Sequence, residues 1–407
     1  MSILIAGAGP AGSRLAELLA INGISVTLVE RLKNPEQNAF SSAVVPFSAL
    51  KNELIPLESV STYWKKWQIY DPSNNFHQWI SDNKLGAVLD FAILRRKLWE
   101  NAVNSGVEFL SGWNVKRVTC SDDFVDVDLY GPNSMFQQRR VLFVVDATGQ
   151  HRSLIGSSQA SSSYGRDKLL TGSGIEWILQ GNSQTVQQWE QSISFFLGSK
   201  WIKNGYAWIF PMSSNRLKVG VCSLPQDKSG ELINHRNLND IKKLLQKLNL
   251  DALPVLDRHG GVIRSTIKRR EPHFSGRIIG IGDTVSTANL LGGEGIRHAL
   301  LSAMVLAPLL VEICCSSAKN DLLSSNILLQ RYQTSLRKKL GWRWSVSNRV
   351  AKKTWWGLSD DIADKRLILL LNFLTSKASA EEISALLFDY RFERYGLRLL
   401  PYLIGWQ

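Results

Sequence analysis

The sequence predicts an α/β protein in which a domain with a parallel sheet is interrupted by a domain with an antiparallel sheet. A helical tail follows. The prediction depends on a β-α-β unit with a glycine-rich turn in residues 1–30, on buried-type strands near residues 141–146 and 277–282, and on alternating strand patterns in residues 168–268. We expect these bounds: 1–155 together with 270–325 for the first domain, 156–269 for the second, and 326–407 for the helical region.

The composition excludes several classes of protein. The chain has 407 residues, of which 44% are hydrophobic and 20% charged, so it can bury a large core. The longest apolar run, residues 299–315, contains Ser302, Pro308 and Glu312 and is shorter than the about 20 residues of a membrane-spanning helix. The N-terminus has no basic segment typical of a signal peptide. Four cysteines without CxxC pairs indicate neither a disulfide framework nor a metal site, so we expect a cytoplasmic protein.

A glycine-rich motif connects the first predicted strand to the first predicted helix and consists of Gly7, Ala8, Gly9, Pro10, Ala11 and Gly12. In this context Gly7 permits a tight turn, Gly9 lets the backbone approach a pyrophosphate, and Gly12 allows close packing of helix on strand. The free N–H groups at the helix N-terminus favour an anion. The motif therefore predicts a dinucleotide site, and a glycine turn without a ligand is the alternative.

An acidic residue ends the second predicted strand. Glu30, followed by Arg31, comes 18 residues after Gly12, where a carboxylate can accept hydrogen bonds from ribose hydroxyls. The same carboxylate would repel a 2′-phosphate. The site therefore favours FAD or NAD over NADP.

Segments far downstream favour FAD. An aspartate at a strand end can hold ribityl hydroxyls, and a glycine-rich helix start can place N–H groups beside the pyrimidine oxygen of a flavin. NAD alone would not need such remote segments. The expected cofactor-binding residues beyond the first motif are Asp146, Gly149, Gly282, Asp283, Gly292, Gly293, Gly295 and Ile296.

One predicted strand of the antiparallel domain carries alternating aromatic residues. Tyr206, Trp208 and Phe210 point to one face, and Ala207 and Ile209 to the other. Three aromatic side chains can form the wall of a long apolar pocket. An ordinary core stripe is the alternative interpretation.

These motifs resemble those of the geranylgeranyl reductase family, within the larger group of hydroxylase-fold flavoproteins. The resemblance rests on GAGPAG with the Glu30-Arg31 pair, VVDATG, GIGD followed by LLGGEGIRHAL, and YAWIFP, which is similar to the family motif YxWxFP. It covers roughly residues 1–310. It implies a Rossmann-type FAD-binding domain, an antiparallel-sheet substrate domain, and reduction of isoprenoid double bonds in chlorophyll side chains or ether lipids. NAD(P)H is one reductant that such an enzyme would use.

The chain departs from the family pattern at several positions. Phe91 stands where the family has an arginine in its RxxFD-type helix start, and Arg95 stands at the acidic position. Residues 38–46 lack the usual glycine and cysteine pattern, and Cys222 replaces the second glycine of GxG. We therefore interpret the chain as a divergent relative.

A basic stretch in the tail predicts a surface for anions. Residues 331–359 contain eight Lys and Arg residues, no acidic residue and four tryptophans, and the whole chain carries a net charge of +13. Tryptophan among basic residues is typical of a membrane interface rather than of a nucleic-acid groove. A solvated helix pair with inward tryptophans is the alternative.

Several reactions fit this fold. The leading hypothesis is reduction of C=C bonds in a long isoprenoid or pigment-type substrate by hydride transfer. The alternatives are hydroxylation of an aromatic, quinone or carotenoid substrate, carotenoid cyclisation, and a membrane-associated flavin- or pigment-binding assembly factor without catalysis. A halogenase is weakly suggested by YAWIFP, without a lysine context. The sequence assigns no catalytic residue, no metal and no oligomeric state.

Overall fold

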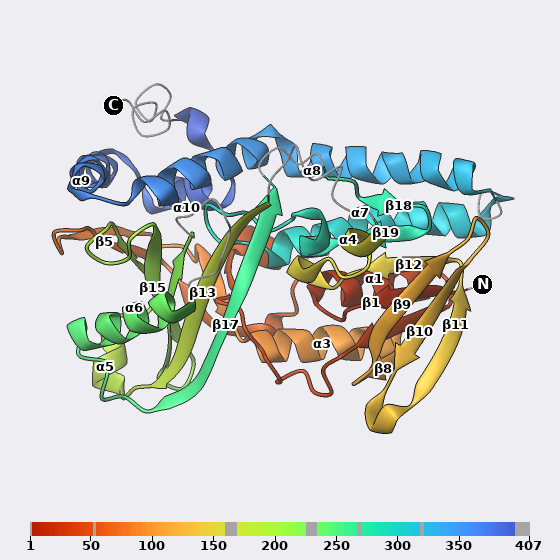
Figure 1. The fold of residues 1–407 in the computed structure, drawn as a ribbon. Coiled ribbons are helices and arrows are strands. Elements are labelled where there is room, and N and C mark those ends of the chain that lie inside the picture. The colour runs from red at the N-terminus through yellow and green to blue at the C-terminus, as the bar shows by residue number, and fades with distance from the viewer. Residues whose placement is uncertain are drawn as a thin grey trace.

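The computed structural model describes residues 2–51, 54–158, 169–224, 234–266, 271–317 and 321–394. It contains two sheet-based halves, and the long helix α8 lies across both (Figure 1). Most of the serine-rich segment 156–165 and the expected boundary at residues 269–270 lie outside the described residues. The domain boundaries therefore stay a prediction.

The first half is built on a six-stranded sheet in the order β18-β19-β12-β1-β2-β8, parallel except for its β18 edge. Helices α1, α3 and α7 cover one face, and a three-stranded sheet, β11-β10-β9, packs on the other. The strands are β1 (Ile3–Ala6), β2 (Val26–Glu30), β8 (Glu108–Ser111), β9 (Asn114–Cys120), β10 (Val125–Tyr130), β11 (Phe136–Val141), β12 (Phe143–Asp146), β18 (Phe274–Ser275) and β19 (Ile278–Gly280), and the helices are α1 (Pro10–Ile21), α3 (Phe91–Asn104), α4 (Ile155–Ser158) and α7 (Ile296–Cys315).

The second half is a seven-stranded sheet in the order β17-β13-β16-β15-β14-β5-β6, antiparallel except for the pair β14 and β5. Its elements are β5 (Lys66–Tyr70), β6 (Phe76–Ile80), β13 (Leu169–Gln180), β14 (Ser192–Leu197), β15 (Gly205–Met212), β16 (Arg216–Ser223) and β17 (Val255–Thr266), with helices α5 (Ser183–Gln187) and α6 (Asn234–Lys247) on the face seen at the left in Figure 1.

For residues 31–85 the sequence predicts no regular element, and this expectation of an irregular stretch is wrong. This stretch supplies β5 and β6 to the large sheet, and a small sheet with the order β3-β7-β4 links the two halves. The linking elements are β3 (Val44–Pro46), α2 (Phe47–Lys51), β4 (Val60–Trp64) and β7 (Gly86–Leu89). The strands are only three to five residues long, so their periodicity was too short to detect.

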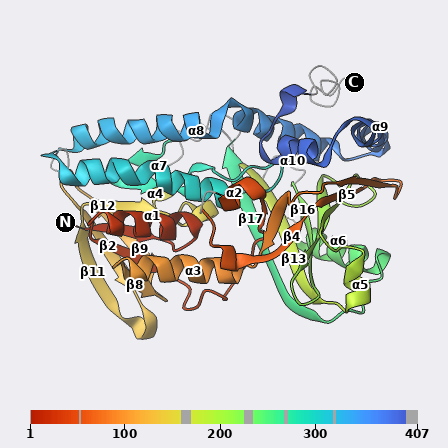
Figure 2. The same ribbon diagram turned by 180° about the vertical axis from the view of Figure 1, so that it is seen from behind.

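The C-terminal region is helical, as predicted, and consists of α8 (Leu322–Gly357), α9 (Asp361–Lys377) and α10 (Ala380–Phe388). Helix α8 bends at Gly341, whose φ of 75° interrupts the helical backbone. Helix α7, beneath α8 in Figure 2, is long and apolar enough to cross a membrane, but 56% of its most apolar window is buried inside the structure, against α1 and α8.

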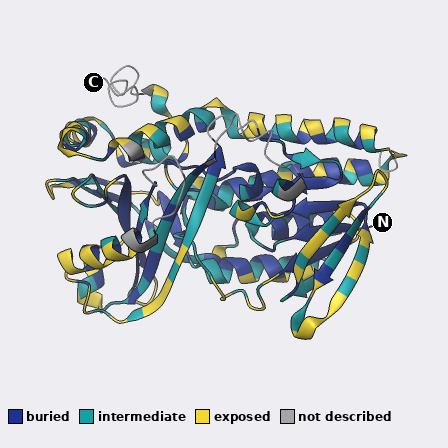
Figure 3. Ribbon diagram, in the orientation of Figure 1, coloured by how far each residue is buried: buried dark blue, intermediate teal, exposed yellow. Residues whose placement is uncertain are grey.

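The large sheet separates two cores. The side chains of Tyr206, Trp208 and Phe210 on β15 belong to a core shared with α8, α9 and α10. Ala207 and Ile209 belong to the core beneath α6 on the opposite face. The predicted alternation along this strand is confirmed, and β15 is buried along its whole length (Figure 3).

Candidate cofactor and substrate site

A cavity of about 320 Å³ lies where the two halves meet. One side is formed by the N-terminus of α1, the turns after β12 and β19, and the N-terminus of α7, and the other by strands β15, β16 and β17. Thirteen of the eighteen predicted site residues line it: Gly9, Pro10, Ala11, Gly149, Gly282, Asp283, Gly292, Gly293, Gly295, Ile296, Tyr206, Trp208 and Phe210. The other five, which lie outside its lining, are Gly7, Gly12, Glu30, Arg31 and Asp146.

The geometry of the first glycine motif fits a pyrophosphate. Gly7 has a φ of +106°, and a Cβ there would lie 2.4 Å from the Ala147 carbonyl oxygen. A Cβ at Gly12 would lie 1.9 Å from the Gly7 oxygen, so both positions need glycine for packing. In contrast, a Cβ at Gly9 would meet nothing within 4 Å, and no side chain caps the helix that begins there. The open N–H groups of α1 therefore face the cavity where an anion can bind.

Glu30 is bound to the motif itself. One carboxylate oxygen accepts a hydrogen bond from the Ala8 N–H at 2.7 Å, and the other accepts from the Leu32 N–H at 3.0 Å. The carboxylate thus fixes the glycine turn to the end of β2. A ribose contact through its remaining lone pairs stays a prediction. Arg31, the next residue, is exposed.

Asp146 supports a turn and does not reach the cavity. Its fully buried carboxylate accepts four hydrogen bonds, two from Thr148 and one each from the N–H groups of Leu154 and Ile155, at 2.6–3.0 Å. These bonds shape the loop that carries Gly149 into the cavity lining. The structure thus shows Asp146 shaping this loop, and a direct contact of Asp146 with the cofactor stays a prediction.

A second helix N-terminus faces the same cavity. Helix α7 begins after Gly295, which offers no side-chain cap, and Asp283 lies beside it at the end of the β19 turn. Burial raises the pKa of Asp283, while the Thr287 hydroxyl, which donates to its carboxylate at 3.2 Å, opposes this rise. Two helix N-termini thus converge on one cavity, and their N–H groups favour negative charge at both places.

The opposite wall is aromatic, and its polar groups are few. Tyr206 lies directly across from Cys222, and Trp208 across from Gly220. The Tyr206 hydroxyl reaches the second glycine motif, because a Cβ at Gly293 would lie 3.0 Å from it. Burial raises the pKa of Cys222 to about 12 and holds the pKa of Tyr206 well above its ordinary value, so both groups stay protonated at neutral pH.

A segment that the sequence left unassigned, residues 40–44, also lines the cavity. Two buried cations hold it. Arg95 donates to the carbonyl oxygens of residues 37 and 38 at 2.7 and 3.0 Å. The Lys218 ammonium donates to the Ser41 and Ser42 oxygens at 2.7 and 3.1 Å. The departure that places Arg95 at an acidic family position was the one sequence signal of this arrangement.

The tail closes the cavity, which the sequence did not predict. Trp355 on α8 packs 4.6 Å from the Tyr206 ring, and its Nε1–H donates to the Leu290 oxygen at 2.9 Å. Phe388 at the end of α10 also lines the cavity, and Arg297 on α7 donates to its carbonyl oxygen at 2.8 Å.

The tryptophans of the basic stretch differ in burial. Trp344 and Trp355 are buried, which agrees with the inward-packed alternative, whereas Trp342 is 63% exposed.

Fold and site together define the class of protein: a flavoprotein with a Rossmann-type FAD-binding domain and a hydroxylase-like substrate sheet. A family model described as "FAD binding domain" matches residues 1–45, which include the glycine motif and Glu30. FAD is thus confirmed as the cofactor, and the part that the second helix N-terminus plays in holding it stays a prediction.

The relatives identify the chain more narrowly. It is 27% identical over 320 residues to the digeranylgeranylglycerophospholipid reductase of Haloferax volcanii, covering 75% of this chain and 74% of the relative. A reductase of the same name from Methanococcoides burtonii is 23% identical, with coverage of 95% and 91%. A solved geranylgeranyl bacteriochlorophyll reductase-like protein from Thermoplasma acidophilum has a TM-score of 0.78 at 19% identity, with 98% of both chains covered. The predicted resemblance to the geranylgeranyl reductase family is confirmed, at identities below 30%.

Proposed function

We propose that this protein is an FAD-dependent oxidoreductase that reduces carbon–carbon double bonds in a long isoprenoid substrate, such as the geranylgeranyl chain of a lipid or pigment. The observation that carries the proposal is the aromatic wall of Tyr206, Trp208 and Phe210 opposite the N-terminus of α7. An apolar chain enters such a pocket without leaving polar groups unpaired. The names of the relatives support the same substrate class.

The chain's own residues would bind and orient the reactants. Bound FAD, once reduced, would supply the hydride, and a proton taken up from the medium would complete the reduction of the double bond. The open N–H groups of α1 would hold its pyrophosphate, and those after Gly295 would favour negative charge on the flavin ring. The aromatic wall and Trp355 exclude water and align the alkene. We also propose that NAD(P)H or another external donor reduces the flavin again after each turnover.

The alternatives are less well supported. Solved structures that share the fold include a flavin-dependent halogenase and p-nitrophenol 4-monooxygenase, so the fold alone does not select the reaction. No lysine is found among the described residues that line the cavity, and Lys218 is turned away to backbone carbonyls, which disfavours halogenation. Hydroxylation stays the second candidate, because these fold neighbours include a monooxygenase.

We also propose that the enzyme meets its lipid substrate at an anionic membrane surface through α8. Six of the eight basic residues in the basic stretch are exposed. Arg331, one of the six, pairs with Glu312 at 3.0 Å, and the partly buried Arg343 pairs with Glu393. Each Lys or Arg near an anionic surface contributes about 1 kcal/mol of binding free energy, so several of them together suffice for reversible binding.

Product mass separates the reactions. The FAD-loaded enzyme, a reductant and a geranylgeranyl phospholipid are incubated in detergent micelles, and the products are weighed by mass spectrometry. We expect the gain of one hydrogen pair for each double bond reduced. A gain of one oxygen would establish hydroxylation instead, and an unchanged mass with altered retention would establish cyclisation.

A further inference from the structure

A row of four residues crosses the substrate sheet and begins at Trp208, in the pocket wall. Trp208 on β15 is paired with Gly220 on β16, Gly220 with Glu176 on β13, and Glu176 with His259 on β17. Their side chains therefore share one face of the sheet. A Cβ at Gly220 would lie 2.1 Å from Cζ2 of Trp208, so the indole lies directly over this glycine. It thereby reaches the next strand, where Nε1–H donates to Oε2 of Glu176 at 2.8 Å.

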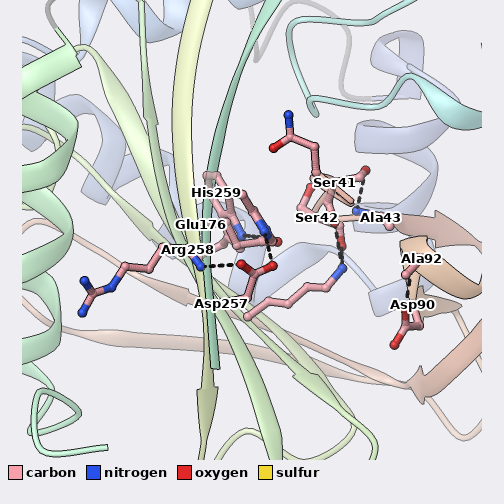
Figure 4. A network of polar contacts seen from close by, with 12 residues as sticks. Ser41, Ser42, Ala43, Asp90, Ala92, Glu176, Asp257, Arg258 and His259 are labelled. Carbon is pink, nitrogen blue, oxygen red and sulfur yellow. Dashed lines mark hydrogen bonds and ion pairs between the residues drawn. The ribbon is translucent and has the colours of Figure 1, made fainter. Parts of the chain in front are cut away.

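The row continues as a polar chain to the surface. The Glu176 side chain is 0% exposed, and its Oε1 lies 3.2 Å from Nε2 of His259. Nδ1 of His259 lies 2.9 Å from Oδ2 of Asp257, whose side chain is 53% exposed. Figure 4 shows these contacts running from Asp257 through His259 to Glu176. The exposed carboxylate of Asp257 is thus connected, through His259 and then Glu176, to the indole that lines the pocket.

We propose that Glu176 and His259 are positioning residues that hold the Trp208 indole in place for the substrate, and that protonation of His259 tightens this hold. The proposal rests on the proposed function for the meaning of the pocket. The hold on the indole itself can be measured without any activity.

The two nitrogens of His259 explain the dependence on protonation. A neutral imidazole has one N–H and can donate to Glu176 or to Asp257, whereas an imidazolium donates to both. Burial lowers the pKa of His259, but its hydrogen bonds to the two carboxylates and their charges outweigh burial and leave the pKa raised. The doubly bonded state is therefore present at low pH and is lost as pH rises through this raised pKa.

One other charged group near the row is Lys218, on the same face of β16. Its ammonium donates to the carbonyl oxygens of Ser41, Ser42 and Leu89, at 2.7–3.1 Å, and its charge also attracts the Glu176 carboxylate. Arg258, the neighbour of His259, stacks 4.6 Å over the Trp177 ring, which belongs to the core on the opposite face. The segment packed on the other side of His259 presents the Phe40 ring, 5.0 Å away, which carries no charge. His259 is thus the group of the row whose protonation we propose to act on the indole.

The direct test observes the indole N–H. Protein with ¹⁵N-labelled tryptophan is studied as the FAD-loaded full chain, and the Trp208 signal is assigned by its disappearance in Trp208→Phe. An N–H that donates to a carboxylate resonates at low field, so Glu176→Gln should move the signal upfield. Glu190→Gln, which changes an exposed glutamate of the same domain, should leave it in place. A Trp208 signal unmoved by Glu176→Gln would overturn the proposal.

The pH dependence gives a second test in the unmodified protein. The Trp208 signal should titrate with an apparent pKa above the ordinary value of a histidine, and His259→Gln should abolish this titration while the fold and the FAD content are retained. This test holds even where Glu176→Gln fails to fold. A wild-type signal that does not change between pH 6 and pH 9 would overturn the role of His259.

Kinetics connect the row to function and separate the two proposals. His259→Gln should raise the KM for a geranylgeranyl phospholipid about tenfold, with a smaller change in kcat, because it loosens a wall and removes no reacting group. A shifted indole signal in a protein that reduces no alkene would support the positioning and refute the proposed function. Alkene reduction with an indole signal unmoved by either variant would do the reverse.

Discussion

Two tryptophans on one helix provide a sharp test of how the tail is used. Trp355 is 9% exposed, lies 4.6 Å from the Tyr206 ring and donates to the Leu290 oxygen, whereas Trp342 is 63% exposed. Truncation of a buried tryptophan costs about 3–5 kcal/mol, and the lost hydrogen bond is included in that range. We expect Trp355→Ala to fall near the lower end, since the void it leaves merges with an existing cavity of about 320 Å³. Trp342→Ala should stay within about 0.5 kcal/mol of wild type.

The assay is urea unfolding of the FAD-loaded protein, followed by far-UV circular dichroism, with the change in unfolding free energy taken from the midpoint at constant slope. Trp355→Ala should also shift the preference of the enzyme toward longer isoprenoid chains, because it removes one end of the pocket. Equal effects of the two substitutions on stability would refute the structural account of the tail. An unchanged chain-length preference in Trp355→Ala would show that Trp355 supports the fold without bounding the pocket.

Three further predictions concern the cofactor and the surface. Gly9→Ala should fold normally yet weaken FAD binding at least tenfold, since its Cβ meets only the space for the pyrophosphate. Gly12→Ala would place a Cβ 1.9 Å from a backbone oxygen and should therefore lower the melting temperature as well. FAD titration and thermal unfolding distinguish the two variants. Glu30→Gln should weaken FAD binding less than Gly9→Ala does. It should destabilise the glycine turn by about 1–2 kcal/mol, because it weakens the charged hydrogen bonds to the Ala8 and Leu32 N–H groups. An unchanged unfolding midpoint in urea would contradict this loss of stability. Because residues 331–359 are basic, the protein should float with anionic vesicles at low salt and not at high salt. If it did not float at low salt, only the inward-packed interpretation of this stretch would remain.

The sequence was most informative where backbone geometry dictates the residue. Gly7 and Gly12 are required by contacts that any Cβ would violate, so the motif predicted both the turn and the cofactor site. The alternation of Tyr206, Trp208 and Phe210 likewise predicted the aromatic wall, because successive side chains of a strand must alternate. Thirteen of the predicted site residues line one cavity, and Gly7 and Gly12 shape the turn beside it.

The parts that the sequence did not reveal depend on long-range pairing. Glu176 and His259 are 83 positions apart and become neighbours only through the register of β13 and β17. Trp355 could be a membrane anchor or a pocket residue until its helix is placed against β15. The sequence could not reveal the turn that Asp146 holds, because a strand-end carboxylate serves a turn as readily as a ligand, and its four hydrogen bonds appear only in the fold.

The central claim, that this pocket reduces an alkene, is tested most directly without oxygen. The FAD-loaded enzyme is reduced chemically under anaerobic conditions, excess reductant is removed, and a geranylgeranyl phospholipid is added while the flavin absorbance is followed. Hydride transfer to a double bond reoxidises the flavin without oxygen, so we predict that the oxidised absorbance returns and that one hydrogen pair appears in the lipid for each flavin oxidised. A flavin that stays reduced until oxygen is admitted, and a lipid that then gains an oxygen atom, would contradict the account.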